Sequence, residues 1–449
     1  MSAGHAATAD SSLLGQSPVG WRVDRIRDHL SGIVGGEWGD DPDAHDDGIE
    51  LPVIRVADIR DLDLTVNGLT IRRIKESKLT GRLIGKQTIL LEKSGGGENK
   101  PVGRAVRTNR VTFDAICSNF MAKVDCCDTV APEFVVYMLD ALYSSGVNGA
   151  CIQQTTVIQN LRVLDYLNTK VAFPPLHEQQ NIAAYLDASC AAIDAAVSAK
   201  RRQLDTLEAL RKSIIQRAVT FGIEANPKLR QVNSDWIREV PSHWDVCRVK
   251  RVVARMDYGI GVSTGDEGRY PVLKMGNVQD GEIQFVKLDF IDEVDDNLIL
   301  ERGDLLYNRT NSPDQVGKAA IFRKSRADAI TFASYLVRLR VNHRVNAWYL
   351  NYVLNSSGFL AFARRLAVPS VQQSNLNSTR YAQMFIPLPP IEEQKAILSF
   401  LNEKTAAVDT VVATIQTQIE TLTAYRKSLI HECVTGQRRV TEADVAAIA

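Results

Sequence analysis

The sequence has little of several features that would assign it quickly. Its 449 residues include 53 basic and 53 acidic residues, so it has no net charge, and only 7% are aromatic. No stretch approaches the roughly 18 uninterrupted apolar residues that a membrane-spanning helix needs, so we expect no membrane association. The segment from Met1 to Gly20 has neither a basic end nor an apolar run, which predicts a cytoplasmic protein without a secretory signal.

Cysteine and histidine patterns also exclude common kinds of site. The seven cysteines are an odd number and show no C-x-x-C spacing, and Cys126 and Cys127 are adjacent, which suits neither a zinc site nor a simple disulfide framework. We therefore expect buried, reduced thiols. None of the seven histidines pairs with a second His or Cys at ligand spacing, so we predict no metal site.

Motifs for catalysis are missing as well. Residues 81–86 (GRLIGK) are one residue too short for a phosphate-binding loop, and Gly259-Ile-Gly261 lacks the third glycine of a dinucleotide fingerprint. The sequence contains no HExxH, no GxSxG and no NPP or DPP aromatic tetrapeptide of an amino-methyltransferase. We therefore predict a chain that is not an enzyme by itself and needs no cofactor.

An internal repeat organises the chain. Residues 174–220 align without a gap on residues 389–435, an offset of 215, with 20 identities in 47 positions. A weaker match places Pro18 and Trp21 on Pro241 and Trp244, an offset of 223. The chain therefore consists of two variable blocks, each followed by one copy of a similar segment.

The repeated segments have the periodicity of coiled-coil helices. Their apolar positions alternate in steps of four and three residues, which is the spacing of a coiled-coil seam. The seam positions are Ile193, Val197, Lys200, Leu204, Leu207, Arg211, Ile214 and Ala218 in the first copy, and Val408, Val412, Ile415, Ile419, Leu422, Arg426, Leu429 and Cys433 in the second. A chain that returns through a globular block between two similar helices can close on a pseudo-twofold axis, which favours an antiparallel pair. The alternative is that each helix packs on its own domain.

The variable blocks have mixed patterns. We predict strands at 83–91, 110–113, 270–275, 304–308 and 335–341, and helices at 132–144 and 346–366. The predicted fold class is α+β, with two mixed α/β domains at 14–173 and 236–388. Two long helical spacers at 174–225 and 389–440 separate these domains and complete a pseudo-twofold repeat.

Charge is segregated within each block. Residues 37–63 contain 10 acidic and 2 basic residues, whereas residues 69–110 contain 11 basic and 3 acidic ones. The second block repeats this order, with 8 acidic and 1 basic residue at 280–301, and 9 basic and 3 acidic residues at 302–344. A basic tract is typical of a surface that neutralises phosphates. The alternative is local balance of both signs on solvated strands.

Loops within the basic tracts carry side chains suited to base edges. Residues 93–100 (KSGGGENK) and 308–312 (NRTNS) each follow an apolar strand and precede a glycine, Gly103 or Gly317. Arg and Lys bond guanine, and Asn and Gln bond adenine, in the major groove. Two glutamine pairs, at 153–154 and 372–373, recur at similar distances before the proline pairs. The candidate DNA-binding residues are Lys93, Ser94, Asn99, Lys100, Arg104, Gln153, Gln154, Lys274, Asn308, Arg309, Thr310, Asn311, Lys318, Gln372 and Gln373.

Together these features resemble the specificity subunits of type I restriction-modification systems. The resemblance rests on the two PP-x-x-E-Q helix starts at 174–179 and 389–394, the Arg-Lys-Ser helix ends at 211–213 and 426–428, the P-x-x-W openings and residues 303–322. The first block departs from the pattern, because Thr80 to Lys86 replaces the Gly-Asp turn that usually precedes the strand.

The resemblance implies two target recognition domains that bind the two halves of a split double-stranded DNA target. It implies two methyltransferase subunits and motor-endonuclease (restriction) subunits as partners in host defence. The candidate residues for the spacer and for partner binding are Glu178, Gln179, Leu204, Leu207, Arg211, Glu393, Gln394, Ile419, Leu422 and Arg426. The alternative function is a helical adaptor with peptide- or ligand-binding domains, which would show no salt-dependent binding to duplex DNA.

Overall fold

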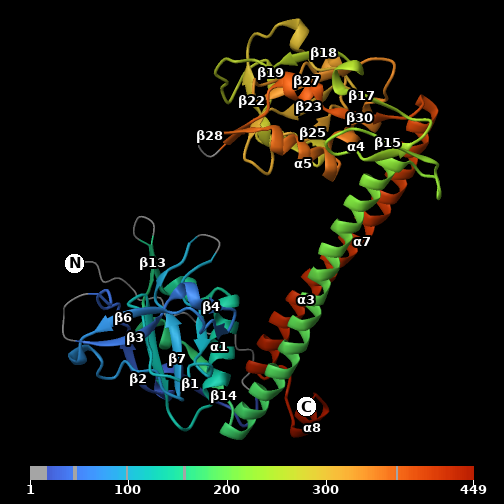
Figure 1. Ribbon diagram of the computed structural model, residues 1–449. Coiled ribbons are helices and arrows are strands. Elements are labelled where there is room, and N and C mark those ends of the chain that lie inside the picture. Colours follow the sequence, from blue (N-terminus) through green and yellow to red (C-terminus); the bar gives the residue numbers. More distant parts are fainter. Residues whose placement is uncertain (1–17, 44–47, 98–99, 155–157, 371–372, 449) are drawn as a thin grey trace. The chain divides into compact units, whose positions relative to one another are not determined.

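The computed structural model describes residues 18–448 except 44–47, 98–99, 155–157 and 371–372. The chain divides into two compact units, of which the first contains residues 1–200 and 417–449 and the second contains residues 201–416. Each unit holds one variable block and parts of two long helices, α3 (Leu176–Phe221) and α7 (Ile391–Val434) (Figure 1). The unit boundary lies inside both helices, so the four-segment division predicted from the sequence stays a prediction.

The first unit is built from small, mainly antiparallel sheets around helix α1 (Pro132–Ser144). Its largest sheet has the order β2 (Leu30–Gly35), β11 (Met121–Cys126), β7 (Thr88–Glu92) and β9 (Ala105–Arg107). A second sheet contains β10 (Ile116–Cys117), β3 (Ile49–Ile54) and β6 (Thr70–Ile74), and a third contains β12 (Ile152–Gln154), β13 (Gln159–Leu161) and β8 (Ser94–Gly95). The remaining elements are β1 (Arg22–Arg25) with β14 (Lys170–Phe173), β4 (Ile59–Arg60) with β5 (Asp63–Leu64), α2 (Val163–Leu167) and α8 (Glu442–Ile448).

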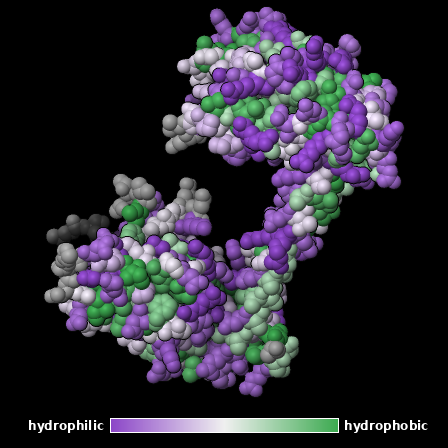
Figure 2. Space-filling view, in the orientation of Figure 1, coloured by the Kyte–Doolittle hydropathy of each residue, from purple (hydrophilic) through white to green (hydrophobic). Residues whose placement is uncertain are grey.

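The second unit has a corresponding arrangement around a larger sheet. Its six strands have the order β18 (Val253–Tyr258), β27 (Leu336–Val341), β23 (Leu305–Asn308), β25 (Ala319–Ile321), β21 (Gly281–Ile283) and β20 (Val278–Gln279). Two three-stranded sheets contain β22 (Asp289–Ile291), β19 (Tyr270–Leu273) and β26 (Thr331–Phe332), and β24 (Thr310–Asn311), β29 (Gln373–Asn375) and β28 (Val368–Ser370). The remaining elements are β15 (Leu229–Gln231) with β16 (Glu239–Pro241), β17 (Asp245–Arg248) with β30 (Phe385–Leu388), α4 (Ala347–Leu354), α5 (Ser357–Leu366) and α6 (Ser378–Gln383). Hydrophilic side chains predominate on the visible surface of this unit (Figure 2).

The two blocks close in the same way. In the first unit β1 pairs antiparallel with β14, and in the second unit β17 pairs antiparallel with β30. The sequence offsets of 223 and 215 place β1 on β17 and β14 on β30. Each block therefore begins and ends at one strand pair, directly before a proline pair and a long helix.

The long helices use the predicted seam and run antiparallel. In the first unit Ile193 of α3 shares a hydrophobic core with Leu429 and Cys433 of α7. In the second unit Ala218 of α3 shares a core with Ile397 and Leu401 of α7. The beginning of each helix therefore accompanies the end of the other, and the predicted antiparallel pair is confirmed.

Two ion pairs show how closely the repeat is preserved. In the first unit Arg426 Nε lies 3.3 Å from Asp194 Oδ1, and in the second unit Arg211 Nε lies 3.6 Å from Asp409 Oδ1. The repeat offset of 215 carries each pair onto the other, with the helices exchanged. The pairing register of the two helices is therefore the same in both units.

Several details differ from the sequence-based prediction. The first expected strand begins at Thr88 instead of residue 83, and residues 110–113 form a turn and coil instead of a strand. The helix expected at 346–366 is interrupted at Asn355 and Ser356, so that it forms α4 and α5. At this break the Asn355 side chain donates to the carbonyl oxygens of Ala319 and Asn351 instead of continuing a helical face.

Helix α3 is long and apolar enough to meet a composition test for a membrane span. Within this stretch Ile182, Leu186 and Ile193 are buried in the first unit's core. Its carboxylates Asp187 and Asp194 pair with Arg107 and Arg426. These features are typical of a core helix.

The seven cysteines are all free; five are buried, and Cys127 and Cys247 are partly exposed.

Candidate nucleic-acid interface

The structure brings the predicted loops together in the first unit. Ser94 begins β8, which pairs with β13, and β13 pairs with β12, which carries Gln153 and Gln154. The Ser94 hydroxyl donates to Asn160 Oδ1 over 2.7 Å, which ties the two loop segments together. Two segments that are far apart in the sequence therefore form one small surface sheet.

The second unit builds the same sheet. Thr310 and Asn311 form β24, which pairs with β29 at Ser374 and Asn375, and β29 pairs with β28. Asn375 Nδ2 donates to the Thr310 hydroxyl oxygen over 3.3 Å. Gln373, the described residue of the second glutamine pair, therefore lies on a strand that pairs with the loop at 308–312.

The equivalence extends to the backbone behind each loop. Glu92 N donates to Arg104 O over 2.8 Å, and Asn308 N donates to Lys318 O over 2.8 Å. Gly103 and Gly317 precede these acceptors, and both have positive φ, at 120° and 84°. Each predicted loop is thus held on a hairpin of the same design. We refer to residues 93–95 with 152–154 as the first loop site, and to residues 309–311 with 373–375 as the second loop site.

Arg309 is the most distinctive side chain of the second loop site. Its guanidinium lies over the ring of Tyr258, 5.1 Å from the centroid, which is a cation–π arrangement. The Tyr258 hydroxyl is 2.8 Å from Ser378 Oγ. Burial raises the pKa of Tyr258, but its hydrogen bonds with Ser378 and the charge of Arg309 outweigh this effect and lower the pKa below its ordinary value. Sequence reasoning missed Tyr258, because β18 lies far before the loop in the sequence and only strand pairing brings it there.

Asn308 requires a correction. Its side chain is fully buried at the end of β23, and both of its polar atoms have no hydrogen-bond partner among the described residues. A fully buried amide is not available to a base edge. The equivalent position in the first unit holds the buried Glu92, which shows that this position faces the interior in both blocks.

Arg104 and Lys274 also have structural partners. Arg104 Nε donates to Glu92 Oε2 over 2.8 Å, which neutralises that buried carboxylate and raises the pKa of Arg104. The Lys274 ammonium pairs with Asp289 and, by this hydrogen bond, lowers the pKa of the Asp289 carboxyl. We therefore leave Arg104 and Lys274 out of the proposed interface.

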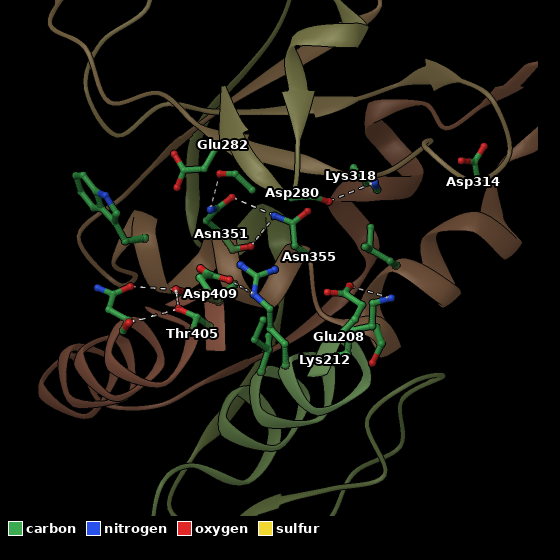
Figure 3. A pocket seen from close by; sticks show the side chains of 18 of the residues that line it. Glu208, Lys212, Asp280, Glu282, Asp314, Lys318, Asn351, Asn355, Thr405 and Asp409 are labelled. Carbon is green, nitrogen blue, oxygen red and sulfur yellow. Dashed lines mark hydrogen bonds and ion pairs between the residues drawn. The ribbon is translucent and has the colours of Figure 1, made fainter. Parts of the chain in front are cut away.

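Lys318 faces a different part of the second unit. It pairs with Asp280 at 3.6 Å and lines a polar cavity of about 730 Å³ between the sheet and the long helices (Figure 3). Charges of both signs surround this cavity, including Glu208, Lys212 and Asp409. Lys318 therefore lies among ion pairs near the helices, and the prediction that it contacts DNA is not supported by its position.

The remaining candidates differ in accessibility. Lys100, Gln153, Gln154 and Gln373 are exposed, while Lys93, Ser94, Arg309 and Asn311 are partly exposed. Thr310 is buried and acts within the sheet. Asn99 and Gln372 lie outside the described residues.

Many residues of the basic tracts form ion pairs, and several of their partners lie in the acidic tracts that precede them. In the second block Arg323 pairs with Glu282, Arg326 with Asp296, and Arg340 with Glu301 and Asp304. In the first block the pairs are Arg72 with Asp41, Arg73 with Glu50, Lys78 with Glu37, and Arg110 with Asp63. The alternative of local charge balance therefore describes most of these residues, and phosphate binding stays a prediction for exposed residues such as Lys100.

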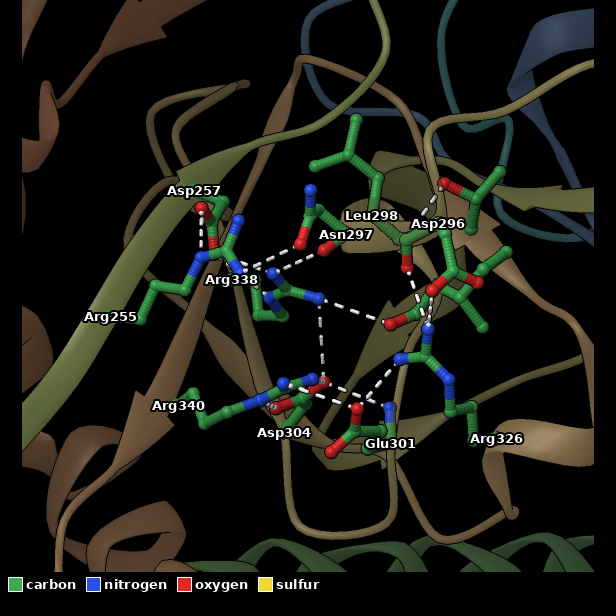
Figure 4. Close-up of polar contacts among 12 residues, drawn as sticks. Arg255, Asp257, Asp296, Asn297, Leu298, Glu301, Asp304, Arg326, Arg338 and Arg340 are labelled. Atoms are coloured by element: carbon green, nitrogen blue, oxygen red, sulfur yellow. Dashed lines mark hydrogen bonds and ion pairs between the residues drawn. The ribbon is translucent and has the colours of Figure 1, made fainter.

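Arg338 shows most clearly that a residue of the basic tract can be structural. It is fully buried on β27 and donates to Asp257 Oδ2 over 2.6 and 3.1 Å, and to the carbonyl oxygens of Asn297 and Ile299 over 2.7 and 3.1 Å (Figure 4). Asp304 Oδ2 lies 3.8 Å from it. A buried charge needs such partners, so Arg338 belongs to the core of the second unit and not to a DNA-binding surface.

The PP-x-x-E-Q motifs join each block to its helix. Gln179 Oε1 accepts from Ala131 N over 2.9 Å, and Gln394 Oε1 accepts from Asn346 N over 2.7 Å. Their amide groups donate to the carbonyl oxygens of Pro174 and Pro389. Both glutamines are buried, so their predicted role in partner binding is corrected to an internal joint.

The glutamates of these motifs act at the same joints. Glu393 accepts from Trp244 Nε1 over 2.9 Å and is 2.8 Å from His243 Nε2. Glu178 instead accepts from Arg439 Nε over 2.9 Å. The other spacer candidates lie along the seam and are all partly exposed: Leu204, Leu207, Arg211, Ile419, Leu422 and Arg426.

In the described part of the chain, no group of three or more His, Cys, Asp or Glu side chains is placed to hold a metal ion. The loop sites instead offer amide, hydroxyl and guanidinium groups, which are hydrogen-bonding groups suited to nucleic-acid bases and phosphates.

Comparison with known proteins agrees with this architecture. Residues 245–421 match the family of the type I restriction modification DNA specificity domain. The putative type I restriction enzyme MjaX specificity subunit of Methanocaldococcus jannaschii is 28% identical over 205 residues, which cover 44% of this chain and 47% of the relative. The type I restriction enzyme StySPI specificity subunit of Salmonella potsdam is 21% identical over 398 residues, which cover 86% of this chain and 82% of the relative.

Solved structures share the fold. A structure described as the structural basis of complex assembly and conformational transition of the type I R-M system matches with a TM-score of 0.71 at 15% identity, covering 94% of this chain and all of the other. The HsdS subunit of Thermoanaerobacter tengcongensis matches with a TM-score of 0.53 at 16% identity, covering 94% and 99% of the two chains. Residues 245–421 therefore contain a type I restriction modification DNA specificity domain. Over most of its length the chain is similar to the specificity subunits of type I restriction-modification systems, as its repeat and motifs predict.

Proposed function

We propose that the chain recognises a bipartite DNA target, with each block contacting one half-site, and directs the methylation and restriction carried out by partner subunits. The observation that supports this most directly is the duplicated loop site. Each unit presents polar side chains on a small sheet fixed to a buried hairpin. Two such sites in one chain correspond to two half-sites in one target.

The partners in this proposal are two methyltransferase subunits and the motor-endonuclease subunits, acting together on double-stranded DNA in the cytoplasm. The chain itself contributes recognition and no catalytic group, and it requires no cofactor of its own. The adaptor alternative is less well supported, because the specificity-domain match covers most of the second block and runs on into α7.

Affinity and specificity come from different groups in this scheme. Exposed basic side chains such as Lys100 supply salt-dependent contacts with phosphates. Arg309 and the exposed glutamines supply hydrogen bonds to base edges, and each bidentate contact contributes about 1–3 kcal/mol of discrimination. A few such contacts in each block are enough to specify a half-site.

The test starts from the complex with the cognate methyltransferase. Sequencing methylated adenines in cells that express both proteins gives the target, and Arg309→Ala should relax one half-site while the other stays unchanged. We expect a loss of about 1–3 kcal/mol on the true target and a smaller loss on random duplex. An equal loss on both DNAs would assign Arg309 to phosphate contact, and methylation without a bipartite target would refute the proposed function.

A further inference from the structure

Each unit contains a four-residue turn that presents one exposed aromatic ring. The turns span residues 118–121 and 333–336 and are closed by hydrogen bonds from Met121 N to Ser118 O and from Leu336 N to Ala333 O, each 2.9 Å. The third residue is Phe120 in one turn and Tyr335 in the other, and these are 41% and 47% exposed. The repeat offset of 215 carries one turn onto the other.

Each turn is attached directly to the adjacent loop site. The carbonyl oxygen of Phe120 accepts hydrogen bonds from Lys93 N and Ser94 N, over 2.9 and 3.1 Å. The carbonyl oxygen of Tyr335 accepts from Arg309 N and Thr310 N, over 3.0 and 3.4 Å. The ring-bearing residue therefore lies beside the first two residues of the loop site in both units.

The opposite side of each turn is anchored to the interior of its block. Ser118 N donates to Ile54 O and Ala333 N donates to Leu273 O, each over 2.8 Å. The segments at Gly36 and Gly259 also pack against the turns: a Cβ at Gly36 would lie 2.2 Å from Ser118 O, and a Cβ at Gly259 would lie 2.1 Å from the carbonyl oxygen of Phe332, directly before the turn. Only glycine fits there. The turns are consequently rigid platforms and not flexible loop tips.

Rigid exposure of an aromatic ring has no benefit for folding, because apolar surface is stabilised by burial. A single exposed ring would be ordinary. Here, however, the ring recurs at the same turn position in two blocks that otherwise differ in sequence, and the preceding and following contacts are also preserved. In the first unit Phe120 and Trp38 also line an open depression of about 350 Å³ together with Arg55 and Asn119.

On this basis, and resting on the proposed function, we infer that Phe120 and Tyr335 are specificity-determining residues that contact thymine methyl groups, one in each half-site. The 5-methyl of thymine is the apolar group that a paired base presents at the major-groove edge, and aromatic side chains such as Phe are suited to it. Polar neighbours at positions 93–94 and 309–311 would bond the adjacent base edges. Each block then combines one apolar contact with several polar contacts on a shared backbone frame.

The experiment removes single methyl groups from the DNA. After the target of the parent complex is known from its methylated adenines, duplexes are made with uracil in place of each thymine, one position at a time. Binding of the complex of this chain with its methyltransferase subunits is measured by competition. The parent complex should lose about fourfold affinity at one thymine in each half-site, the value of one buried group of this size.

The variants then assign each methyl group to its ring. Phe120→Ala should remove the thymine-over-uracil preference in one half-site only, and Tyr335→Ala should remove it in the other. Leu164→Ala is the control for Phe120→Ala in the first unit, and Val286→Ala is the control for Tyr335→Ala in the second unit. Each control replaces an apolar side chain that is 62% exposed. Both controls should keep the preference at both half-sites.

Three results would overturn the inference. The parent complex could bind thymine and uracil equally at all positions, the two ring variants could keep the preference, or they could lose affinity equally on both kinds of duplex. Each of these outcomes leaves the bipartite target intact, so it would refute the role of the rings and not the proposed function. Absence of any bipartite target in the parent complex would refute the proposed function itself.

Discussion

Arg338→Met should destabilise the second unit while leaving its DNA contacts unchanged. The substitution removes a fully buried guanidinium but keeps an unbranched apolar side chain on β27. Asp257 keeps one partner, because Arg255 Nε donates to its Oδ1 over 2.7 Å. The carbonyl oxygens of Asn297 and Ile299 lose their hydrogen bonds from Arg338.

The size of the effect follows from these lost partners. Removing one member of a buried ion pair costs about 3–5 kcal/mol, and each buried acceptor left without a donor costs about 1–3 kcal/mol within that total. Because Arg255 still forms a hydrogen-bonded ion pair with Asp257, we expect a value at the low end of this range, a loss of about 3 kcal/mol in the free energy of unfolding. The double variant Arg338→Met, Asp257→Leu should recover part of this loss, because it removes the carboxylate as well as its partner.

Urea denaturation followed by tryptophan fluorescence measures this change, since the second unit contains Trp236, Trp244 and Trp348. The same variants are then tested for DNA binding over a range of salt concentrations. Each lost phosphate contact would reduce the slope of log affinity against log salt concentration by about 0.9. We expect no change in slope for Arg338→Met. A reduced slope, with a stability loss below about 1 kcal/mol, would show that Arg338 contacts DNA and that the buried network in Figure 4 is misassigned.

Three further predictions concern stability, geometry and catalysis. Burial raises the pKa of Asp140 to about 6 in the folded protein, so this group favours folding below its unfolded pKa of 3.8, and that contribution is lost as the pH rises to about 6. Asp140→Asn should therefore stabilise the first unit at pH 7 by about 1–3 kcal/mol but not at pH 3.5. Equal effects at both pH values in thermal unfolding would contradict this assignment. Inserting four residues after Leu204 adds about 6 Å of helix and should lengthen the unspecified gap between the two half-sites by one or two base pairs, with both half-site sequences unchanged, as measured from the methylated sites. An unchanged gap would argue against the idea that the long helices set the distance between the half-sites. The purified chain alone should neither methylate nor cut DNA, and activity of a rigorously pure sample with S-adenosylmethionine, or with ATP and magnesium, would refute this.

Periodicity and repetition made the helices predictable from the sequence. The seam residues alternate over several helical turns in each copy, and both copies match along their length, so the position of both helices and their seam followed from local spacing. The antiparallel pairing was inferred from the return of the chain through a globular block, and the helices, at 46 and 44 residues, extend beyond the seam that the spacing marks. Helix α1 was predicted at its observed bounds because its apolar pattern follows a proline that suits a helix start. The break between α4 and α5 was not predictable, since it depends on contacts of Asn355 with the strand β25, which is distant in the sequence.

Sequence spacing placed candidate loops at 93–100 and 308–312, because each follows an apolar strand and precedes a glycine. The structure brings residues 94–95 and 310–311 of these loops onto small sheets, and their role in DNA binding stays a prediction. Sequence spacing could not show that Asn308 points inward, or that Arg338 and Arg340 lie beside carboxylates from earlier segments. Those contacts arise because strand pairing brings distant segments together. The number of charged residues in a stretch of sequence does not show this. The one available signal for the two turns was the offset of 215, which places Phe120 on Tyr335.

The hydrogen bonds that hold each turn to its loop site join main-chain atoms only. The carbonyl oxygen of Phe120 accepts from the amides of Lys93 and Ser94, and the carbonyl oxygen of Tyr335 accepts from the equivalent amides of Arg309 and Thr310, although the side chains differ. Substitution of the side chains at 93–94 or 309–310 therefore leaves these main-chain hydrogen bonds intact and changes only the groups that the loop site presents. Under the proposed function, this arrangement would let single replacements change the DNA target without a compensating change in the fold, and the two halves of the target could diverge independently.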